Sequence, residues 1–369
     1  MKVIIAAAGT AGHINPGISI ARIIEKNFKN SDIRFIATGK KLEEDLISKA
    51  GYKSYKIHAN GFSSKPTISN IKKNFETLKG FKEAKKILKE FKPDLVIGTG
   101  GYICASVIYE ARKLKIPTML HESNAYPGLA IRMLNKINKV DTIMLGIDEA
   151  RNYLNNKCNI VFTGTPTTLD TTKLTKTKKE SVYKDLKLKK DKKIVFIFGG
   201  SQGALKINNA VVDLLKHNLN EDYQIILGTG NNNYDNVIKS LNGKYKNAVI
   251  MPYIYNISDV MKVSDLIVAR SGAMTLTEIS LLKKPSIFIP LPSSKSNRQE
   301  DNARVFERKG ASKIILNNEI EYKILDKYIK EIISDDKLLK KMGNNASLMA
   351  PKNSEDKILK EILKLIKKS

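Results

Sequence analysis

The chain has 369 residues, and its 64 Lys and Arg against 37 Asp and Glu give a formal net charge of +27. This length suits two domains, and an apolar fraction of 42% is that of a globular rather than a disordered chain. Cys104 and Cys158 have neither a disulfide framework nor a metal-ligand spacing, which indicates a reducing compartment. No stretch is long enough to span a bilayer, so we expect a soluble or peripheral protein. The charge favours polyanionic partners, although a lysine-rich composition alone would produce much of it.

Short apolar strands alternate with helical periodicity along the whole chain, which is the pattern of a parallel α/β fold. In the first half the predicted strands are Val3–Ala7, Ile33–Ala37, Leu95–Gly98, Thr118–His121, Thr142–Leu145 and Ile160–Thr163. In the second half they are Ile194–Phe198, Gln224–Leu227, Ala248–Met251, Leu266–Ala269, Ser286–Ile289 and Lys313–Leu316. The polar segment Thr168–Lys193 separates the two sets, and we place the domain junction at its start, near residues 164–166.

Each half opens with a buried strand, a glycine-rich turn and an amphipathic helix, as in two Rossmann-like domains. In the first half, Asn15 is predicted to cap the helix and Pro16 to occupy its first position. In the second half, the helix after Gly203 is predicted to bury a stripe made of Ile207, Ala210, Val211 and Leu214.

Four glycine-rich turns follow predicted strands: Gly9–His13, Gly98–Tyr102, Gly199–Gly203 and Ser271–Ala273. At a helix N-terminus the unpaired N–H groups and the positive end of the dipole attract an anion, and glycine lets the anion approach the backbone. Glycine also simply makes tight strand-to-helix turns, which is the commoner reason for any single one of them. Four such turns on two domains favour phosphate binding.

Other nucleotide-binding and nucleic-acid-binding classes fit the motifs less well. A nicotinamide cofactor requires G-x-G-x-x-G and a carboxylate at the end of the second strand, but the first turn has G-x-x-G and the second strand runs into Thr38-Gly39-Lys40. No G-K-[ST] follows any of the turns, which excludes a P-loop. Nucleic-acid binding would explain the charge but not the four turns, and the sequence has no aromatic stacking motif or recognition helix.

The segments GTAGHINPG, GTGGY, HESNAYPG, GGSQGA and RSGAMTLTEI, followed by NRQEDNA, resemble the MurG family of peptidoglycan N-acetylglucosaminyltransferases in content and in order. The resemblance implies a GT-B fold, in which two Rossmann-like domains with parallel sheets face each other across a cleft. Residues 1–164 would form an N-terminal domain for the acceptor and the membrane. Residues 165–350 would bind the UDP-sugar, and residues 351–369 would form a helix that packs back on the N-terminal domain.

The implied reaction transfers N-acetylglucosamine, with inversion, from UDP-N-acetylglucosamine to the 4-hydroxyl of muramic acid in undecaprenyl-diphosphate-linked MurNAc-pentapeptide. This step converts lipid I to lipid II in peptidoglycan synthesis. The resemblance implies a peripheral enzyme at the cytoplasmic face of the bacterial membrane, with an anionic membrane surface but no nucleic acid as a partner. No metal or other cofactor is expected. A related glycosyltransferase acting on diacylglycerol, and a sugar-nucleotide epimerase, remain alternatives.

The family's site residues are carried over by motif. The donor contacts fall on Thr10, Ala11, Gly12, Asn124, Ser201, Ile254, Ala273, Met274, Thr275, Leu276, Thr277, Glu278 and Gln299. The acceptor-side loop falls on Gly100, Gly101 and Tyr102. Ser201 is expected to meet the diphosphate, and Ile254 to pair with uracil through its backbone.

For three residues, Glu278, His13 and Glu122, the chemistry of the side chain itself suggests a role. A carboxylate at Glu278 can accept from both ribose hydroxyls, although a glutamate near the start of a helix also stabilises that helix. His13 is the candidate general base, because histidine titrates near neutrality; it could instead fix the geometry of its loop. Glu122 is a rival base, and its alternative role is a structural carboxylate that binds loop amides.

Three positions depart from the family pattern. The first loop has Ala11 where the family often has glycine, and Ser123 stands where it usually has glutamine. The segment Gly164-Thr165-Pro166 continues with Thr167 and Thr168, where the family commonly has an arginine that contacts the donor.

The segment from Lys72 to Lys92 holds eight lysines against three glutamates. Phe81, Ala84, Leu88 and Phe91 share one helical face, which we interpret as the side buried in the domain core. Another face is shared by Ile71, Phe75 and Leu78, and Phe62 precedes them along the chain. We expect these four residues to contact the membrane.

Overall fold

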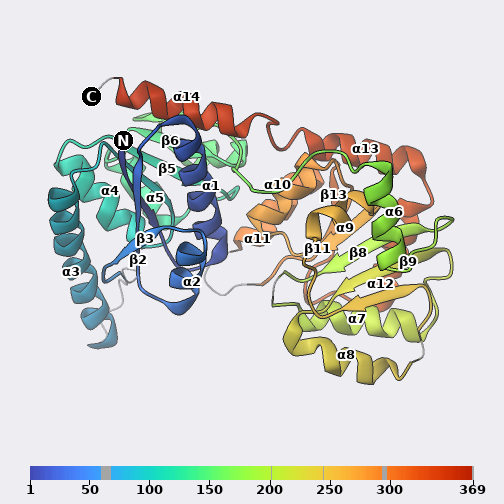
Figure 1. Ribbon diagram of the computed structural model, residues 1–369. Helices are drawn as coiled ribbons and strands as arrows, with labels where there is room; N and C mark the ends of the chain where they lie inside the picture. The colour runs from blue at the N-terminus through green and yellow to red at the C-terminus, as the bar shows by residue number, and fades with distance from the viewer. Residues whose placement is uncertain (60–67, 201, 244, 293–296, 368–369) are drawn as a thin grey trace. The chain divides into compact units, whose positions relative to one another are not determined.

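In the computed structural model the chain divides into two compact units (Figure 1). One unit is formed by residues Met1–Thr168 together with Pro351–Ser369, and the other by Leu169–Ala350. The structure describes residues 1–59, 68–200, 202–243, 245–292 and 297–367, with the side chains of 68–75 left out. Across these ranges, no helix combines the length and the apolar composition that crossing a bilayer requires.

The first unit is built on a seven-stranded sheet in which every neighbouring pair is parallel. Its strands are β1 (Lys2–Ala7), β2 (Asp32–Ala37), β3 (Lys53–Lys56), β4 (Leu95–Gly100), β5 (Thr118–Glu122), β6 (Thr142–Leu145) and β7 (Asn159–Phe162), in the order β3-β2-β1-β4-β5-β6-β7. The six predicted strands are confirmed to within a few residues. The edge strand β3 was missed, because Lys-Ser-Tyr-Lys has no apolar run and stays largely exposed.

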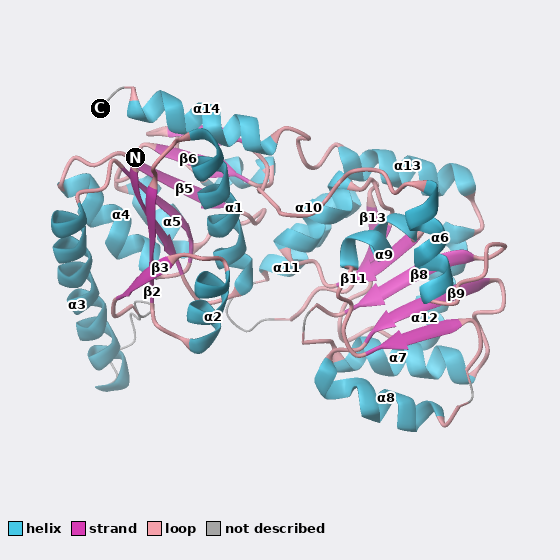
Figure 2. Cartoon of the chain, in the orientation of Figure 1, coloured by secondary structure: helices cyan, strands magenta, loops and turns pink. Residues whose placement is uncertain are grey.

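Helices cover both faces of this sheet (Figure 2). On one face pack α1 (Ala11–Asn27), α2 (Lys41–Lys49) and α14 (Ser354–Ile366). On the other pack α3 (Ile68–Phe91), α4 (Ile103–Lys113) and α5 (Leu129–Lys136). Ile358 and Ile362 of α14 are fully buried in the same core as α1, and Asn159 donates to Glu361 over 2.8 Å. The C-terminal helix is therefore an integral part of the first unit.

The start of α1 differs from the sequence prediction. The helix begins at Ala11 with Thr10 as its N-cap, so that Pro16 lies inside the helix and Asn15 caps nothing. Pro16 has no N–H to donate to the carbonyl of Gly12, four residues before it. The helix starts earlier because the carbonyl of Thr10 accepts from the backbone N–H groups of both His13 and Ile14. The first helical turn therefore contains Gly12 and His13, which the sequence had placed in a loop.

The second unit is built on a six-stranded parallel sheet in the order β10-β9-β8-β11-β12-β13. Its strands are β8 (Lys193–Phe198), β9 (Tyr223–Gly228), β10 (Ala248–Met251), β11 (Leu266–Ala269), β12 (Ser286–Phe288) and β13 (Ser312–Ile314). Its helices are α6 (Lys176–Asp185), α7 (Leu205–Lys216), α8 (Tyr234–Leu241), α9 (Ile257–Val263), α10 (Ala273–Leu281), α11 (Arg298–Arg308), α12 (Tyr322–Ile333) and α13 (Asp336–Ser347). The predicted stripe of α7 is confirmed, since all four of its residues are buried in the core.

Candidate active site

Each sheet reverses its strand order at one place, between β1 and β4 in the first unit and between β8 and β11 in the second. In open α/β sheets, ligands bind beyond the carboxyl ends of the strands at such a reversal. The four glycine-rich turns follow these same four strands. The fold therefore brings the turns together in two pairs, one pair at the binding edge of each sheet.

His13 lies between the two turns of the first unit. Its backbone N–H donates to the Thr10 carbonyl over 3.0 Å, and its own carbonyl accepts from the Thr99 hydroxyl over 2.7 Å. A Cβ atom on Gly100 would stand 2.0 Å from the His13 ring, so only glycine fits there. The His13 side chain is half-buried, while Thr10 and Gly12 are exposed beside it. The histidine is thus held at the edge of the sheet as a half-buried residue.

The second turn of this pair carries the predicted acceptor-side loop. Gly101 has a φ of +87°, and a Cβ there would meet the Ala8 carbonyl oxygen at 2.6 Å. Tyr102 is the N-cap of α4 and leaves 54% of its surface exposed. The loop after β4 therefore rests on the loop after β1 and presents an aromatic side chain to solvent beside it.

Glu122, at the end of β5, is buried and organises its own loop. One carboxylate oxygen accepts from the backbone and side-chain N–H groups of Asn124, both over 2.9 Å. The other accepts from the Gly128 backbone over 2.6 Å. Both oxygens are engaged, so the geometry fits the structural role that was weighed against general-base catalysis. The amide of Asn124 is held in place by the same carboxylate.

His121 lies beneath this loop with no exposed surface. Its ring is within 3.2 Å of the Gly164 carbonyl and 3.3 Å of the Ser123 hydroxyl. Burial lowers the pKa of His121 to about 4, which keeps the ring neutral at physiological pH. Ser123 is thus turned toward His121 rather than toward solvent. Further along, Thr167 is half-buried and Thr168 exposed, so neither position supplies the cationic contact that an arginine would.

In the second unit, the turns after β8 and β9 pack closely against each other. Gly203 has a φ of +74°, and a Cβ on it would meet the Thr229 carbonyl oxygen at 1.9 Å. Ser201, the predicted diphosphate contact in this turn, lies outside the described residues. Ile254, which follows β10, packs over the end of β9, where a Cβ on Gly228 would be 3.2 Å from its side chain. Ile254 is thus placed at the same edge as these two turns.

The predicted donor segment from Ala273 to Glu278 forms the first two turns of α10, with Gly272 as its N-cap. Ala273, Met274 and Thr275 are partly exposed, but Leu276 is buried and its N–H bonds to the Gly272 carbonyl. The Thr277 hydroxyl donates to the Ala273 carbonyl over 3.0 Å. The side chains of Leu276 and Thr277 therefore support the helix, and their contact with the donor stays a prediction.

Glu278 has a different environment from Glu122. No described residue donates a hydrogen bond to its carboxylate, and burial raises its pKa to about 7. A half-buried carboxyl group without a protein partner, at the binding edge of a sheet, is a candidate ligand contact.

Gln299 lies in the first turn of α11, where its backbone ties that helix to the turn after β11. Its carbonyl accepts from the Ser271 hydroxyl over 2.7 Å, and its side-chain oxygen accepts from the Leu291 backbone over 2.9 Å. With the oxygen engaged, the side-chain NH₂ is the group that can donate to a ligand. Asn302, one turn later, donates to the Ser271 carbonyl over 3.1 Å. The turn Ser271–Ala273 is therefore braced from α11.

Sequence reasoning missed Glu43, a fully buried carboxylate in α2 that accepts from the backbone of Gly9 over 2.7 Å. Its residue type gives no signal, because acidic residues are common in the first turn of a helix. Only the pairing of β1 with β2 brings it beneath the first glycine-rich turn. Among the described residues, no cluster of three His, Cys, Asp or Glu could hold a metal ion.

The family models that match the chain are the glycosyltransferase family 28 N-terminal domain, over residues 3–140, and the glycosyltransferase family 28 C-terminal domain, over residues 194–362. The UDP-N-acetylglucosamine–N-acetylmuramyl-(pentapeptide) pyrophosphoryl-undecaprenol N-acetylglucosamine transferase of Acetivibrio thermocellus is 40% identical over 371 residues, covering 100% of this chain and 99% of that relative. The corresponding transferase of Finegoldia magna is 39% identical and covers 99% and 98% of the two chains.

Among solved structures, MurG of Acinetobacter baumannii superposes with a TM-score of 0.79 at 24% identity, covering 98% of this chain and 99% of that one. This likeness confirms the GT-B class of two Rossmann-like domains. The identity to the curated transferases over the full length goes further than a shared fold. The chain belongs to the MurG family of glycosyltransferase family 28.

Proposed function

We propose that the chain transfers N-acetylglucosamine from UDP-N-acetylglucosamine to the 4-hydroxyl of muramic acid in lipid I, forming lipid II for peptidoglycan synthesis. The observation that carries this function is the full-length identity to transferases named for that reaction. The family's motifs fall on the turns at the strand-order reversals of both sheets, where ligands of this fold bind.

The donor is proposed to bind at the edge of the second unit. The N–H groups at the start of α10 and at the turn Gly199–Gly203 suit a diphosphate, since a helix N-terminus carries a partial positive charge. Glu278 accepts from the ribose hydroxyls, the backbone of Ile254 pairs with uracil, and the side-chain NH₂ of Gln299 donates to the sugar. These contacts would place the anomeric carbon at the same edge.

Transfer is a single displacement with inversion. The acceptor oxygen forms a bond to the anomeric carbon while the bond from that carbon to the UDP oxygen breaks, and UDP leaves with the electron pair. His13 takes the proton of the attacking hydroxyl, a role worth about 10²–10⁴ in rate for a well-placed general base. The N–H groups near the diphosphate stabilise the negative charge that develops on UDP.

The acceptor is proposed to meet the first unit, near Tyr102 and the loop that Glu122 holds. Competition between acceptors tests this. The protein is incubated with UDP-N-acetylglucosamine and either a short-chain lipid I analogue or a dispersed diacylglycerol, and the products are identified by mass spectrometry. We expect glycosylation of the muramic acid sugar alone. Product on diacylglycerol alone would contradict the proposed acceptor and favour a diacylglycerol glycosyltransferase.

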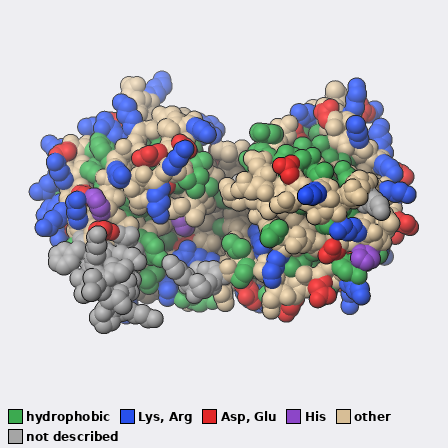
Figure 3. Space-filling view, turned by 90° about the horizontal axis from the view of Figure 1, so that it is seen from below, with side chains coloured by type: hydrophobic (Ala, Val, Ile, Leu, Met, Phe, Trp, Pro, Cys, Tyr) green, Lys and Arg blue, Asp and Glu red, His purple; other side chains and the backbone are tan. Residues whose placement is uncertain are grey.

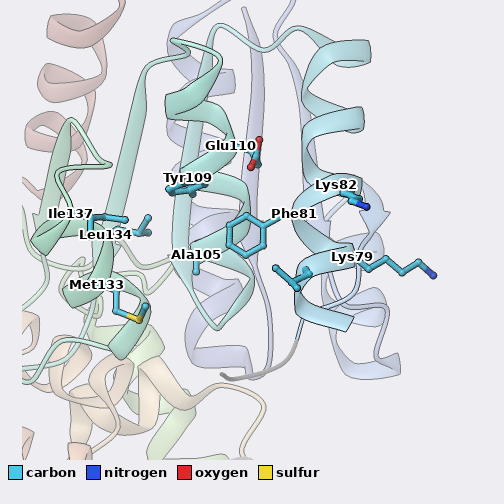
Figure 4. Close-up of a pocket in the computed structure, with 10 residues that line it drawn as sticks. Lys79, Phe81, Lys82, Ala105, Tyr109, Glu110, Met133, Leu134 and Ile137 are labelled. Atoms are coloured by element: carbon cyan, nitrogen blue, oxygen red, sulfur yellow. The ribbon is translucent and has the colours of Figure 1, made fainter. Parts of the chain in front are cut away.

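We further propose that the first unit binds the cytoplasmic face of the membrane through an apolar cavity of about 730 Å³ between α3, α4 and α5 (Figure 4). Phe81 and Tyr109 line it, with ring centroids 5.6 Å apart. Leu78, Met133 and Ile137 surround it with 55%, 45% and 51% of their surface exposed. Exposed apolar side chains gathered at one cavity are unusual on a soluble surface and are typical of a binding site.

Two lysines on α3 lie at this cavity, and Glu110 of α4 is the acidic residue of its lining. Lys79 and Lys82 belong to its lining, and Lys79 extends outward from α3 in Figure 4. Each lysine near an anionic leaflet contributes about 1 kcal/mol of attraction. On the face drawn in Figure 3, by contrast, Lys and Arg are spread over both units rather than gathered in one place. Of the face that the sequence assigned to the core, Ala84, Leu88 and Phe91 are buried. Phe81 was wrongly assigned to the core, because it is half-buried and lines the cavity. Phe62 lies outside the described residues, as do the side chains of Ile71 and Phe75.

Sedimentation with vesicles tests the membrane proposal. Leu78→Glu and Met133→Glu are each expected to weaken binding to phosphatidylglycerol-containing vesicles by about tenfold, since burying such a side chain is worth about 1.5 kcal/mol or more. Leu348→Glu is the control, because Leu348 is 78% exposed on the second unit. Equal binding by all three variants and the wild type would contradict the assignment of the cavity.

A further inference from the structure

Glu43 is a carboxylate with no exposed surface, and its hydrogen bonds explain how it tolerates burial. One oxygen accepts from the backbone N–H of Gly9 over 2.7 Å, and the other from that of Thr38 over 2.8 Å. The Thr38 hydroxyl lies 2.8 Å from both oxygens. A buried charge is costly unless such donors surround it, and here two of the three donors are backbone groups of different loops. Glu43 therefore joins the loop after β1 to the loop after β2.

The loop after β1 leads directly to the candidate base. Gly9 has a φ of +101° and precedes Thr10, whose carbonyl accepts the first hydrogen bonds of α1. His13 follows in the first turn of that helix, with its ring against Gly100. The hydrogen bond from Gly9 to Glu43 thus holds the start of α1 in place. The contact with Gly100 restricts the position of the His13 ring.

The same carboxylate changes what this turn can bind. The Gly9 N–H donates to Glu43, so it is not available to an incoming phosphate. A buried negative charge directly behind the turn also opposes a second anion there, since like charges a few ångströms apart repel strongly in a low dielectric. The carboxylate therefore weakens the attraction of this turn for a phosphate.

We propose that Glu43 is a positioning residue for the transfer reaction, which holds Gly9 and the start of α1 so that His13 faces the acceptor hydroxyl. In this assignment the first glycine-rich turn serves the base, and the donor diphosphate is held by the second unit. The inference rests on the proposed function of His13, and it adds a residue that no motif contains.

The test compares Glu43→Gln with Glu44→Gln, a matched change at the exposed neighbouring residue of the same helical turn. Glutamine keeps the volume of Glu43 but turns an NH₂ group toward N–H donors. Glu43→Gln is expected to lower kcat at least tenfold, with the KM for UDP-N-acetylglucosamine and the Kd for UDP changed less than threefold. Glu44→Gln is expected to match the wild type. Thr38→Val, which removes only the hydroxyl, is expected to lower kcat by a smaller factor.

Hydrogen–deuterium exchange of peptides covering residues 8–13 is measured on the same variants without any acceptor. Faster exchange there in Glu43→Gln, with kcat reduced and UDP affinity kept, supports the proposal. Unchanged kcat in both Glu43→Gln and Thr38→Val would overturn it, as would loss of UDP affinity in step with kcat. If the wild type transfers nothing to a lipid I analogue, the proposed function fails, but the exchange data still decide whether Glu43 braces the turn.

Discussion

The imidazole of His13 lies against the Cα atom of Gly100, at a position where a Cβ on that glycine would be 2.0 Å from Nδ1 of the ring. The two residues come from turns after neighbouring strands, β1 and β4, whose pairing shifts in register between Ala6 and Ala7. This contact connects the candidate base to the acceptor-side loop. Position 100 thus requires glycine because any larger residue would collide with the ring of the candidate base.

Gly100→Ala is expected to displace the His13 ring and to lower kcat by about 10²-fold, because misplacing a reacting group by about 1 Å can cost that much. UDP affinity should stay unchanged, since the proposed contacts to uracil and ribose, Ile254 and Glu278, lie on the other unit. Gly51→Ala is the control: Gly51 has a φ of +91° but no atom within 4 Å of a Cβ, so it carries backbone strain without the clash. A Gly100→Ala enzyme with wild-type kcat would show that the contact does not position the base.

Glu122→Gln distinguishes a loop-forming carboxylate from a general base. Glutamine can still accept from Asn124 but presents NH₂ to the Gly128 N–H, so one charge-assisted hydrogen bond is lost. Such bonds are worth about 1.5–3 kcal/mol, which corresponds to a fall in Tm of about 3–12 °C for a unit of this size. Thermal unfolding followed by circular dichroism measures it. An unchanged Tm with a kcat reduced by 10³ or more would instead assign Glu122 as the base.

Donor affinity is expected to depend on pH through Glu278, whose pKa burial raises to about 7. The ionised carboxylate accepts from both ribose hydroxyls, so binding requires loss of the proton. The ionised fraction falls from about one half at pH 7 to about one eleventh at pH 6, and the Kd for UDP-N-acetylglucosamine should rise about fivefold over that interval. Isothermal titration calorimetry at pH 6, 7 and 8 measures this, and the disubstituted diphosphate of the donor does not titrate in this range.

In Glu278→Gln the pH dependence of donor binding between pH 6 and 8 should disappear, with a weaker Kd at pH 8. A wild-type Kd that is flat from pH 6 to 8 would contradict ribose recognition by the ionised carboxylate.

The same residue should lower the stability of the free protein at alkaline pH. The folded-state pKa of Glu278 lies above its ordinary value of 4.5, so the folded state binds this proton more tightly than the unfolded state. The resulting stabilisation is present below about pH 4.5 and is lost as the pH rises through about 7. Glu278→Gln should therefore unfold at a higher temperature than the wild type at pH 8 but at a similar temperature at pH 5. Scanning calorimetry measures both, and a variant less stable than the wild type at pH 8 would contradict the buried, unpaired carboxylate.

The strands and the turns could be predicted from the sequence because both leave local signals. Runs such as Ile194–Phe198 are continuously apolar, as strands buried on both faces must be, and this run is followed by the glycine-rich turn at Gly199. The strand β3 left no such signal, because it lies at an edge of the sheet and stays half in water. The start of α1 was misplaced because Pro16 is a common first helical residue, whereas here Thr10 accepts the first backbone bonds.

The site residues likewise divide into those with a local sequence signal and those without one. His13, Glu278 and Gln299 could be named because their motifs have fixed residue types at fixed spacings. The roles of Glu122 and Glu43 could not be derived, because both are decided by which loop amides their carboxylates meet. Those amides belong to segments up to 34 residues away in the sequence, as for Gly9 and Glu43. The motif names Leu276 and Thr277 as donor contacts, but it does not tell which side of the helix faces the ligand.

The most direct measurement is the transfer of radiolabelled N-acetylglucosamine from its UDP donor to a short-chain lipid I analogue at pH 8, with His13→Ala and Glu278→Ala assayed beside the wild type. We expect the wild type to form labelled product. His13→Ala should lose kcat by about 10²-fold or more with UDP binding retained, and Glu278→Ala should lose donor affinity. A folded wild-type protein that binds UDP but forms no labelled product would contradict the assigned reaction while leaving the GT-B fold intact.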